Sequence, residues 1–227
     1  NKSAIEDHFD HSVELEATLA AKGKTQALDM VQQMMHNPGS VMYVRQQEPA
    51  GLGHAVWCAR HLAQSEPVAV LLADDLILGT GCLGEMLSAY NGGNMVAVMD
   101  VPQNETASYG IVTPGADDGR IVEVNGLVEK PSPSDAPSNI AVVGRYIIEP
   151  GVFTHLDRQE QGAGGEIQLT DSLARQIGEV PFSGLRFSGE RFDCGSKIGF
   201  LQANIAFALQ RDELGQHLKS WLAERVK

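Results

Sequence analysis

A run of six apolar residues, Val68 to Ala73, is followed directly by two carboxylates, Asp74 and Asp75. An apolar run without alternation predicts a strand buried on both faces, as at the centre of a sheet covered by helices. Ligands of open α/β sheets bind just beyond the carboxyl ends of the strands. Because neighbouring strand residues point to opposite faces, we expect only one of the two carboxylates to enter such a site. A cap on the following turn is the alternative interpretation of the pair.

Composition and charge limit the class of protein. The chain has 227 residues, of which 43% are hydrophobic and 20% charged, as is typical of a globular protein, and we expect a single domain over 1–227. No apolar run approaches the roughly 20 residues that span a bilayer, and no signal-peptide pattern is visible. The formal net charge of −12 argues against nucleic acid or an anionic membrane as the main partner. It still permits a small phosphorylated ligand, held by a local lysine and a divalent cation.

The cysteines and histidines give no metal or disulfide pattern. Cys58, Cys82 and Cys194 are widely spaced and odd in number, which favours a reduced, cytoplasmic protein. His54 and His61 lie seven apart on one predicted helix, whereas helical metal-ligand pairs lie three or four apart. We interpret all seven histidines as structural or solvent-facing.

Glycines mark two places where a backbone can be approached closely. The loop Gly51-Leu52-Gly53-His54 stands between a predicted strand, 41–45, and an apolar-periodic helix. That order of elements lets backbone N–H groups approach a ligand, although glycines that merely permit a tight turn are an equally good interpretation. Gly110 lies just inside a short predicted strand, which indicates close approach of another backbone or of a ligand.

Charged side chains stand where two further strands end. One predicted strand ends at Glu129 and Lys130, and the following Pro131 favours an extended Lys130, so we expect the two side chains to point to opposite sides. An exposed ion pair is the commoner meaning of such a pair. From Asp193 to Lys197, an acid and a lysine flank a glycine between a strand and a helix, a pattern that an ordinary turn with a helix cap also produces.

Two amphipathic helices are predicted at the end of the chain, from Ile198 to Leu209 and from Leu214 to Val226. Trp221 and its apolar neighbours stand among charged residues in the second helix. These helices could dock within the chain or across a dimer, and we expect a homo-oligomer.

Several segments together carry a family resemblance. In chain order they are Ser3-Ala4-Ile5-Glu6-Asp7-His8-Phe9-Asp10, Gly51-Leu52-Gly53-His54-Ala55-Val56, Leu127-Val128-Glu129-Lys130-Pro131, Ala136-Pro137-Ser138-Asn139, Val143-Gly144-Arg145-Tyr146, Glu166-Ile167-Gln168-Leu169-Thr170-Asp171 and Asp193-Cys194-Gly195. Each motif is weak alone, but in this order they resemble the bacterial UTP–glucose-1-phosphate uridylyltransferases (UDP-glucose pyrophosphorylases). The resemblance implies the Rossmann-like α/β fold of nucleotide-sugar transferases, with a mixed, mostly parallel sheet flanked by helices. It also implies that UTP and α-D-glucose 1-phosphate react to give UDP-glucose and pyrophosphate, with Mg²⁺ as cofactor.

The resemblance also implies roles for particular residues. Asp74 and Asp193 would hold Mg²⁺, which takes a small number of hard oxygen ligands. Lys130, with Asp74 the candidate catalytic residue, would contact the phosphate of the sugar phosphate, and Glu129 would accept hydrogen bonds from glucose hydroxyls. The other candidates are expected to bind substrate: Gln46 and Gly51 at the uracil edge, Gly110 and Asn139 at the sugar, and Lys197 at a second phosphate.

One part of the family pattern has no counterpart in this sequence. Members of the family carry an N-terminal strand and a G-x-G-T-R loop that holds the nucleotide triphosphate, whereas Ser3 already matches a point well inside the family chain. We expect that the complete protein carries this block ahead of Asn1, because the central strand and the triphosphate loop are needed for activity.

Three alternative functions remain open from the sequence. A glucose-1-phosphate thymidylyltransferase would differ only in its base pocket. A metal-dependent glycosyltransferase would also hold a nucleotide-sugar diphosphate with acids at a strand end, but it would transfer the sugar and release no pyrophosphate. A non-catalytic nucleotide-sugar-binding protein would bind UDP-glucose without turning it over.

Overall fold

The computed structural model describes residues 3–63 and 65–225, and the chain divides into two compact units, residues 1–47 and 48–227. The single domain expected from the sequence stays a prediction.

The first unit is helical and has no buried core. It contains α1 (Ser3–His8), α2 (Val13–Ala21) and α3 (Thr25–Gln33). Gly23, with a φ of 65°, adopts the left-handed backbone that ends α2 and allows α3 to fold back beside it. None of residues 4–47 is buried.

The strand predicted over 41–45 is wrong. That segment is irregular in the structure, and Val41, Met42, Tyr43 and Val44 are exposed. An apolar, β-branched stretch forms a strand only where a second strand satisfies its backbone groups, and among the described residues of this unit no strand does so.

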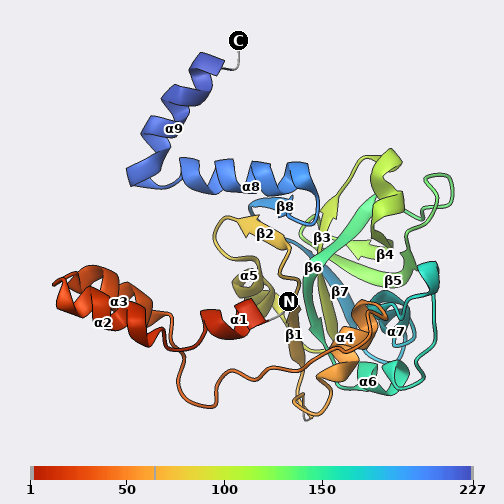
Figure 1. The fold of residues 1–227 in the computed structure, drawn as a ribbon. Helices are drawn as coiled ribbons and strands as arrows, with labels where there is room; N and C mark the ends of the chain where they lie inside the picture. The colour runs from red at the N-terminus through yellow and green to blue at the C-terminus, as the bar shows by residue number, and fades with distance from the viewer. Residues whose placement is uncertain (1–2, 64, 226–227) are drawn as a thin grey trace. The chain divides into compact units, whose positions relative to one another are not determined.

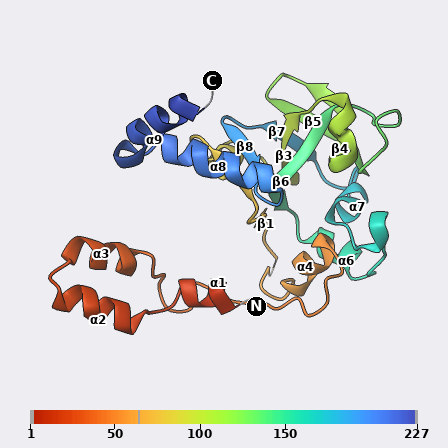
Figure 2. The same ribbon diagram turned by 45° about the horizontal axis from the view of Figure 1, so that its top comes forward.

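The second unit is built on a six-stranded sheet with the order β1-β6-β3-β7-β5-β4, flanked by helices (Figures 1 and 2). Its strands are β1 (Val68–Leu71), β3 (Asn94–Asp100), β4 (Gly110–Asp117), β5 (Ile121–Glu129), β6 (Ile140–Ile148) and β7 (Phe182–Arg186). A separate two-stranded ribbon consists of β2 (Asp75–Leu78) and β8 (Glu190–Asp193). The helices are α4 (Leu52–Cys58), α5 (Cys82–Ala89), α6 (Gly151–Leu156), α7 (Leu169–Ala174), α8 (Lys197–Leu209) and α9 (Asp212–Arg225), with short 3₁₀ segments η1 (Gln103–Ser108) and η2 (Ala163–Gly165). The predicted end of the last helix at Val226 lies outside the described residues.

The α/β fold with a mixed sheet and flanking helices is confirmed, but the expectation of a mostly parallel sheet is wrong. Among the strand pairs of the described residues, only β3 and β7 are parallel. Two connections account for this. The turn at Asp118 and Gly119 joins β4 to β5 as a hairpin, and β6 returns between β1 and β3, so both neighbours run against it. Hairpins and returning strands give antiparallel pairs, since a parallel pair needs a crossover connection.

The core lies on both faces of β3 and β6. Val96 and Val98 of β3 pack with residues of α4, α6 and α7 on one face, while Met95 and Ala97 pack with Met86 of α5 on the other. Successive strand residues alternate between the faces, so a strand covered on both sides is apolar throughout. The most deeply buried strands are therefore β3 and β6.

The apolar run from Val68 is not a central strand, which corrects the sequence interpretation. It forms the four-residue β1 at the sheet edge, paired with β6, and Ala69 and Leu71 are exposed. Residues of β1 and α4 line a groove of about 830 Å³ at this edge. Apolar composition alone cannot tell a covered strand from a short edge strand that borders an open apolar groove.

Candidate active site

Two carboxylates from distant parts of the chain meet beside one glycine. Asp74 lies in the turn between β1 and β2, and Asp193 is the last residue of β8. A Cβ built on Gly195 would lie 3.0 Å from Asp193 Oδ1 and 3.3 Å from Asp74 Oδ2, so both carboxylates face the space that this glycine leaves open. The backbone N–H of Cys194 donates to the carbonyl of Asp74 at 2.7 Å and ties the two turns together. The structure thus brings together the two residues that the resemblance assigned to one cation.

Asp75 serves a different purpose from its neighbour. Its side chain is buried, forms an ion pair with Arg191 of β8 and accepts a hydrogen bond from the backbone N–H of Gly144 at 2.7 Å. Burial is the largest influence on the Arg191 guanidinium and lowers its pKa, but the charge of Asp75, the charges of Tyr109 and Asp193, and the hydrogen bond to Asp75 together outweigh it and raise that pKa. Asp75 is therefore engaged within the chain, and Asp74 alone of the pair stays a candidate for a ligand. The two differ because Asp74 lies in a turn while Asp75 begins β2, not because they alternate along one strand.

The ion pair of Asp75 and Arg191 also fixes the strand register on which the carboxylate pair depends. Asp75 lies opposite Asp193 in the antiparallel β2–β8 ribbon, and Arg191 lies two residues before Asp193. A slip by one residue would turn every side chain of the ribbon to its other face. A buried charge left without its partner in such a slip is costly, so the ion pair holds Asp74 and Asp193 on the same side.

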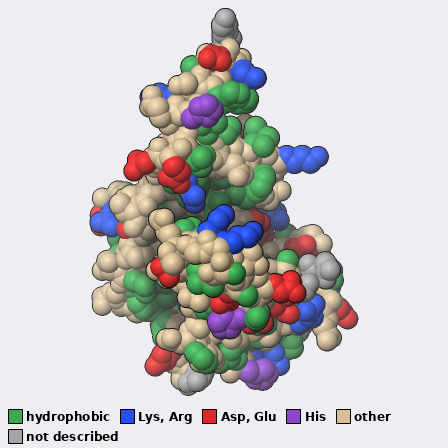
Figure 3. Space-filling model, turned by 60° about the vertical axis from the view of Figure 1, so that its left-hand side comes forward, with side chains coloured by type: hydrophobic (Ala, Val, Ile, Leu, Met, Phe, Trp, Pro, Cys, Tyr) green, Lys and Arg blue, Asp and Glu red, His purple; other side chains and the backbone are tan. Residues whose placement is uncertain are grey.

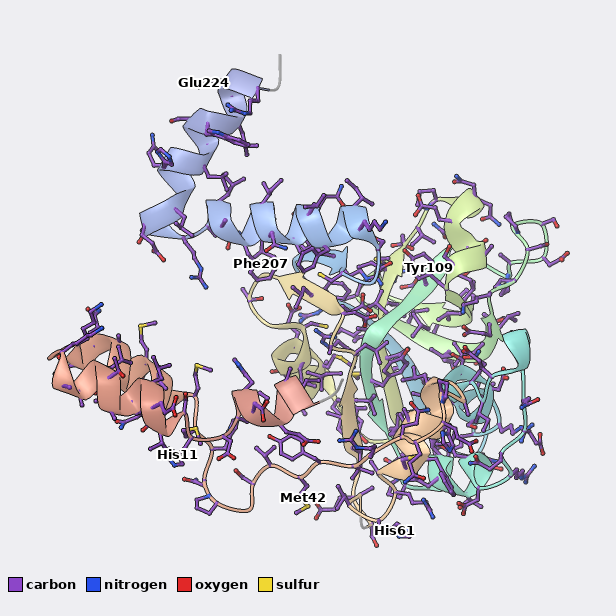
Figure 4. All side chains as sticks on the ribbon, in the orientation of Figure 1. His11, Met42, His61, Tyr109, Phe207 and Glu224 are labelled. Carbon is purple, nitrogen blue, oxygen red and sulfur yellow. The ribbon has the colours of Figure 1, made fainter. Side chains whose placement is uncertain are left out.

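A chain of polar contacts connects this ribbon to the end of β5. Arg191 donates to the hydroxyl of Tyr109 at 3.2 Å and lies over its ring, and the Tyr109 carbonyl accepts the backbone N–H of Lys130 at 2.9 Å (Tyr109 is labelled in Figure 4). Burial first, and then the charges of Glu129 and Asp75, raise the pKa of Tyr146. The contacts of Tyr109 with Arg191 through its side chain and with Lys130 through its carbonyl connect the end of β5 to the carboxylate ribbon.

Glu129 and Lys130 lie on one side, not on opposite sides as their positions in the sequence predicted. Lys130 has a φ of 47°, although it is not a glycine and precedes a proline. Its Nζ is 3.8 Å from Glu129 Oε1, with the lysine half-exposed and Glu129 12% exposed. The left-handed backbone turns the lysine back toward the strand end. Strain of this kind persists where surrounding structure imposes it, and it is concentrated at functional sites.

Gly110 stands opposite Glu129 in the β4–β5 pair and is buried. A Cβ at this glycine would lie 3.1 Å from Glu129 Oε2 and 3.3 Å from Thr170 Cγ2. A side chain at position 110 would therefore press on the carboxylate of Glu129. Thr170, at the start of α7, belongs to this group although sequence reasoning assigned it no role.

Gly51 and Gly53 approach another backbone. Cβ atoms at these two positions would lie 2.8 Å and 2.7 Å from the carbonyl oxygen of Ile167, and Gly53 N–H donates to that oxygen at 2.8 Å. The Ile167 N–H in turn donates to the carbonyl of Ala50. This interlocking explains why both positions are glycine, and a role of Gly51 toward a base stays a prediction.

The remaining candidates have less structural support. Asn139 is exposed, immediately before β6, and its carbonyl accepts the N–H of Val101. Lys197 is the exposed first residue of α8, whose N-cap is Ser196. Gln46 belongs to the first unit, so its role stays a prediction. The helix cap and the acid at this turn occur together, so the two interpretations of 193–197 do not exclude each other.

Sequence reasoning missed the side chains that position the site. Arg191 and Tyr109 lie outside the quoted motifs, and Thr170 lies within one that pointed to no role for it. One signal was available, because Arg191 is a lone cation next to Phe192 in a short strand, and a buried cation needs a carboxylate. The sequence does not say which of the 29 acidic residues supplies it.

The donor set fits a hard divalent cation with few protein ligands. Asp74 is exposed and Asp193 half-buried, and their oxygens share one open space. Within the described residues, no group of three or more His, Cys, Asp or Glu side chains could hold a metal ion. Two carboxylates suit Mg²⁺, which keeps several waters and binds phosphate oxygens as well. They do not suit a structural zinc site, which needs four protein ligands.

The mixed α/β sheet and the pair of carboxylates beside Gly195 are the features with which known proteins can be compared. Residues 11–208 match the Nucleotidyl transferase family, and the chain belongs to that family. Its members generally use a divalent metal ion.

The curated relatives share one name. The chain is 50% identical over 200 residues to the UTP–glucose-1-phosphate uridylyltransferase of Komagataeibacter xylinus, which covers 87% of this chain and 70% of the relative. It is 45% identical over 222 residues to the enzyme of the same name from Bacillus subtilis strain 168, covering 96% and 75%. The resemblance inferred from the sequence is confirmed.

Solved structures agree with the fold. The UTP-bound UGPase of Acinetobacter baumannii matches with a TM-score of 0.89 and 36% identity, over 100% of this chain and 80% of that chain. A UDP-glucose pyrophosphorylase complexed with UDP-glucose matches with a TM-score of 0.82 and 36% identity, over 93% and 78%. No described helix of the protein has the length and apolar character that crossing a membrane requires.

Proposed function

We propose that the protein is a UTP–glucose-1-phosphate uridylyltransferase, which forms UDP-glucose and pyrophosphate from UTP and α-D-glucose 1-phosphate. The observation that carries the proposal is the convergence of Asp74 and Asp193 beside Gly195 in a chain of the Nucleotidyl transferase family. Relatives that are 45–50% identical bear that enzyme name, and similar structures hold UTP or UDP-glucose.

The reaction requires neutralisation of phosphate charge and does not require a general base. The phosphate of glucose 1-phosphate is already an anionic nucleophile; its oxygen bonds to the α-phosphorus of UTP as the bond to pyrophosphate breaks. Catalysis then depends on aligning two anions and on stabilising the charge that develops on the phosphoryl oxygens. A half-exposed lysine, together with a cation that two carboxylates would hold, would align the two anions and stabilise the developing charge.

Each candidate residue has one task in this proposal. Asp74 and Asp193 would hold Mg²⁺, which would supply neutralisation of phosphate charge. Lys130, turned toward Glu129 by its left-handed backbone, contacts the phosphate of the sugar phosphate, while Glu129 accepts hydrogen bonds from glucose hydroxyls. The rest of the substrate contacts are proposed for Gly110 and Asn139 at the sugar, Gln46 and Gly51 at uracil, and Lys197 at a second phosphate.

We further propose a cytoplasmic protein that works as a homo-oligomer. Cys58, Cys82 and Cys194 are all free thiols, which suits a reducing compartment, and burial raises the pKa of the Cys82 thiol to about 11, so that it is unreactive. Exposed apolar side chains of the C-terminal helices support self-association.

The test is a reaction with defined products. The purified protein, given UTP, glucose 1-phosphate and Mg²⁺, should release pyrophosphate and form UDP-glucose in equal amounts. Activity with dTTP well above that with UTP would favour a thymidylyltransferase. Consumption of UDP-glucose without pyrophosphate would favour a glycosyltransferase, and calorimetric binding of UDP-glucose without any turnover would overturn the enzyme proposal.

A further inference from the structure

The turn that carries Asp74 joins two different sheets. Strand β1 ends at Leu71 in the six-stranded sheet, and β2 begins at Asp75 in the two-stranded ribbon. Residues 72–74 fall between the two strands, so neither strand ladder fixes the direction of the Asp74 side chain. Backbone groups in such a turn need other hydrogen-bond partners.

One arginine supplies several of these partners. Arg145 lies on β6, in the register opposite the end of β1. Its Nη1 donates to the carbonyl of Leu72 at 3.1 Å and to that of Gly144 at 2.8 Å, while its Nη2 donates to the carbonyl of Asp75 at 2.5 Å. The guanidinium therefore holds the turn both before and after Asp74.

The backbone of β6 is built to reach this turn. The Leu72 N–H donates to the carbonyl of Gly144 at 2.9 Å. A Cβ at Gly144 would lie 2.8 Å from Leu72 Cβ and would press on the carboxylate of Asp75. Only a glycine fits there, and it brings the Arg145 side chain within reach of the turn. The contact is thus part of the fold and not the chance position of a surface arginine.

The remaining backbone of the turn is held from the other side. The Asp74 carbonyl accepts the N–H of Cys194 at 2.7 Å. With Arg145 on one side and Cys194 on the other, the backbone around Asp74 is fixed. The exposed carboxylate of Asp74 is then the part that faces the open space beside Gly195. A guanidinium suits this task because its donors form a rigid, planar fork.

We propose that Arg145 is a positioning residue for the cation, which aims the carboxylate of Asp74 at the space it shares with Asp193. The inference rests on the proposed function, because it gives Arg145 a part in binding Mg²⁺. Groups that orient a metal ligand without touching the metal typically contribute about 10- to 100-fold to metal affinity. Arg145 therefore acts on the affinity for the cation and much less on the reaction once the cation is bound.

The overall charge of the chain does not provide this affinity. The formal net charge is −12, yet acidic and basic side chains are scattered among the others over the face drawn in Figure 3. Attraction by scattered surface charge is weak and screened by salt. Mg²⁺ demands near-ideal octahedral geometry, so two carboxylates bind it well only when both are held in the right direction. The orientation of Asp74 thus decides the affinity.

The first experiment measures cation binding without any turnover. Mn²⁺, a paramagnetic substitute for Mg²⁺, is titrated into the purified chain, and free Mn²⁺ is measured by electron paramagnetic resonance. Binding that Asp74→Asn abolishes should be weakened about tenfold or more in Arg145→Met. The matched control is Arg60→Met, since Arg60 is also half-buried and donates to a carbonyl, that of Trp57 at 3.2 Å. It should bind Mn²⁺ like the wild type.

Turnover gives a second readout, which a loss of folded protein would not produce. In Arg145→Met, the Mg²⁺ concentration at half-maximal rate should rise about tenfold, whereas kcat at saturating Mg²⁺ should fall less than about threefold. Partial unfolding would instead lower kcat at an unchanged Mg²⁺ requirement. That pattern would overturn the role of Arg145.

Arg145→Lys decides the matter if the methionine variant does not fold. Lysine keeps the charge, but its single nitrogen does not reproduce the fork that joins the carbonyls. This variant should still need several-fold more Mg²⁺ and Mn²⁺ than the wild type, and wild-type affinity in it would overturn the inference.

Failure of the inference and failure of the proposed function give different results. Wild-type Mn²⁺ affinity in a folded Arg145→Met chain would overturn the inference and leave the function standing. Mn²⁺ binding that depends on Asp74 and Arg145, in a chain that forms no UDP-glucose, would support the inference and contradict the function. Mn²⁺ binding that Asp74→Asn does not change would overturn both.

Discussion

The two halves of the candidate site are held in place by different means. The carboxylate half, on the β2–β8 ribbon, is fixed by a buried ion pair between Asp75 and Arg191 and by backbone hydrogen bonds. The lysine half, at the end of β5, depends on a strained backbone at Lys130, in which a non-glycine residue has a φ of 47°. The carboxylate half is therefore stabilised by buried interactions. The lysine half is less stable, because the backbone conformation that orients the Lys130 side chain is strained.

The largest expected effect concerns the lysine half. Lys130→Ala should lower kcat/KM by about 1,000-fold, or about 4 kcal/mol, because it removes the positive charge proposed to contact the phosphate. The fold should survive, since the lysine is half-exposed. Steady-state kinetics with circular dichroism checks both. Wild-type kinetics in the variant would remove Lys130 from the site.

The next effect is on stability and comes from the carboxylate half. Arg191→Met should destabilise the fold by about 3 kcal/mol, because it leaves the Asp75 carboxylate buried without a positive charge to neutralise it. Urea unfolding measures this. Arg186→Met is the control, because Arg186 pairs with the more exposed Asp100 and Asp117 and should cost much less. Equal losses of unfolding free energy in the two variants would show that the buried ion pair contributes no more to stability than the exposed ones.

A third change separates metal binding from folding. Asp74→Asn should lower kcat/KM by about 100-fold, or about 2.7 kcal/mol, at fixed Mg²⁺, and higher Mg²⁺ should recover part of the loss. Asp74 is exposed and its turn is held by its carbonyl, so the melting temperature should hardly change. The control is Asp118→Asn in the β4–β5 turn, which should keep full activity. A Mg²⁺ requirement equal to that of the wild type would contradict the assignment.

The smallest effect tests the strain itself. Lys130→Gly should be more stable than Lys130→Ala by about 1 kcal/mol, because glycine accepts a positive φ without steric cost. Both variants should be equally inactive. Gln159, with a φ of 51°, gives the matched position away from the site: Gln159→Gly should gain stability over Gln159→Ala and keep activity. An alanine variant as stable as glycine at position 130 would show that the backbone there is unstrained.

How far the sequence predicted the site depends on the kind of constraint. The order of motifs predicted the family. The expectation that Asp74 and Asp75 serve different purposes agrees with the structure, although Asp74 lies in a turn and not in a regular strand. Strand alternation failed at Glu129 and Lys130, because it assumes regular backbone and Lys130 leaves it. The proline rule failed there as well, since a local steric preference of this size yields to the hydrogen bond from Lys130 N–H to Tyr109.

The fold shows the same division. The apolar run at Val68 correctly indicated a strand, yet its place at the sheet edge and the many antiparallel pairs follow from where β6 returns. Hydrophobic patterning indicates that a segment is apolar. It does not determine which strands pair with that segment, because the pairing depends on residues far away in the sequence.

The sequence by itself determined the family, the α/β class and the chemical types at the site, because these depend on residue identity and local periodicity. Only the tertiary structure decided that Asp74 and Asp193 share one space, that Arg191 neutralises Asp75, and that one face of α8 is left open. Each of these is a contact or an exposure set by segments far apart in the chain. Such contacts form only when the sheet assembles, since the partner of a buried charge or of an apolar face comes from a distant part of the chain and not from the neighbouring residues.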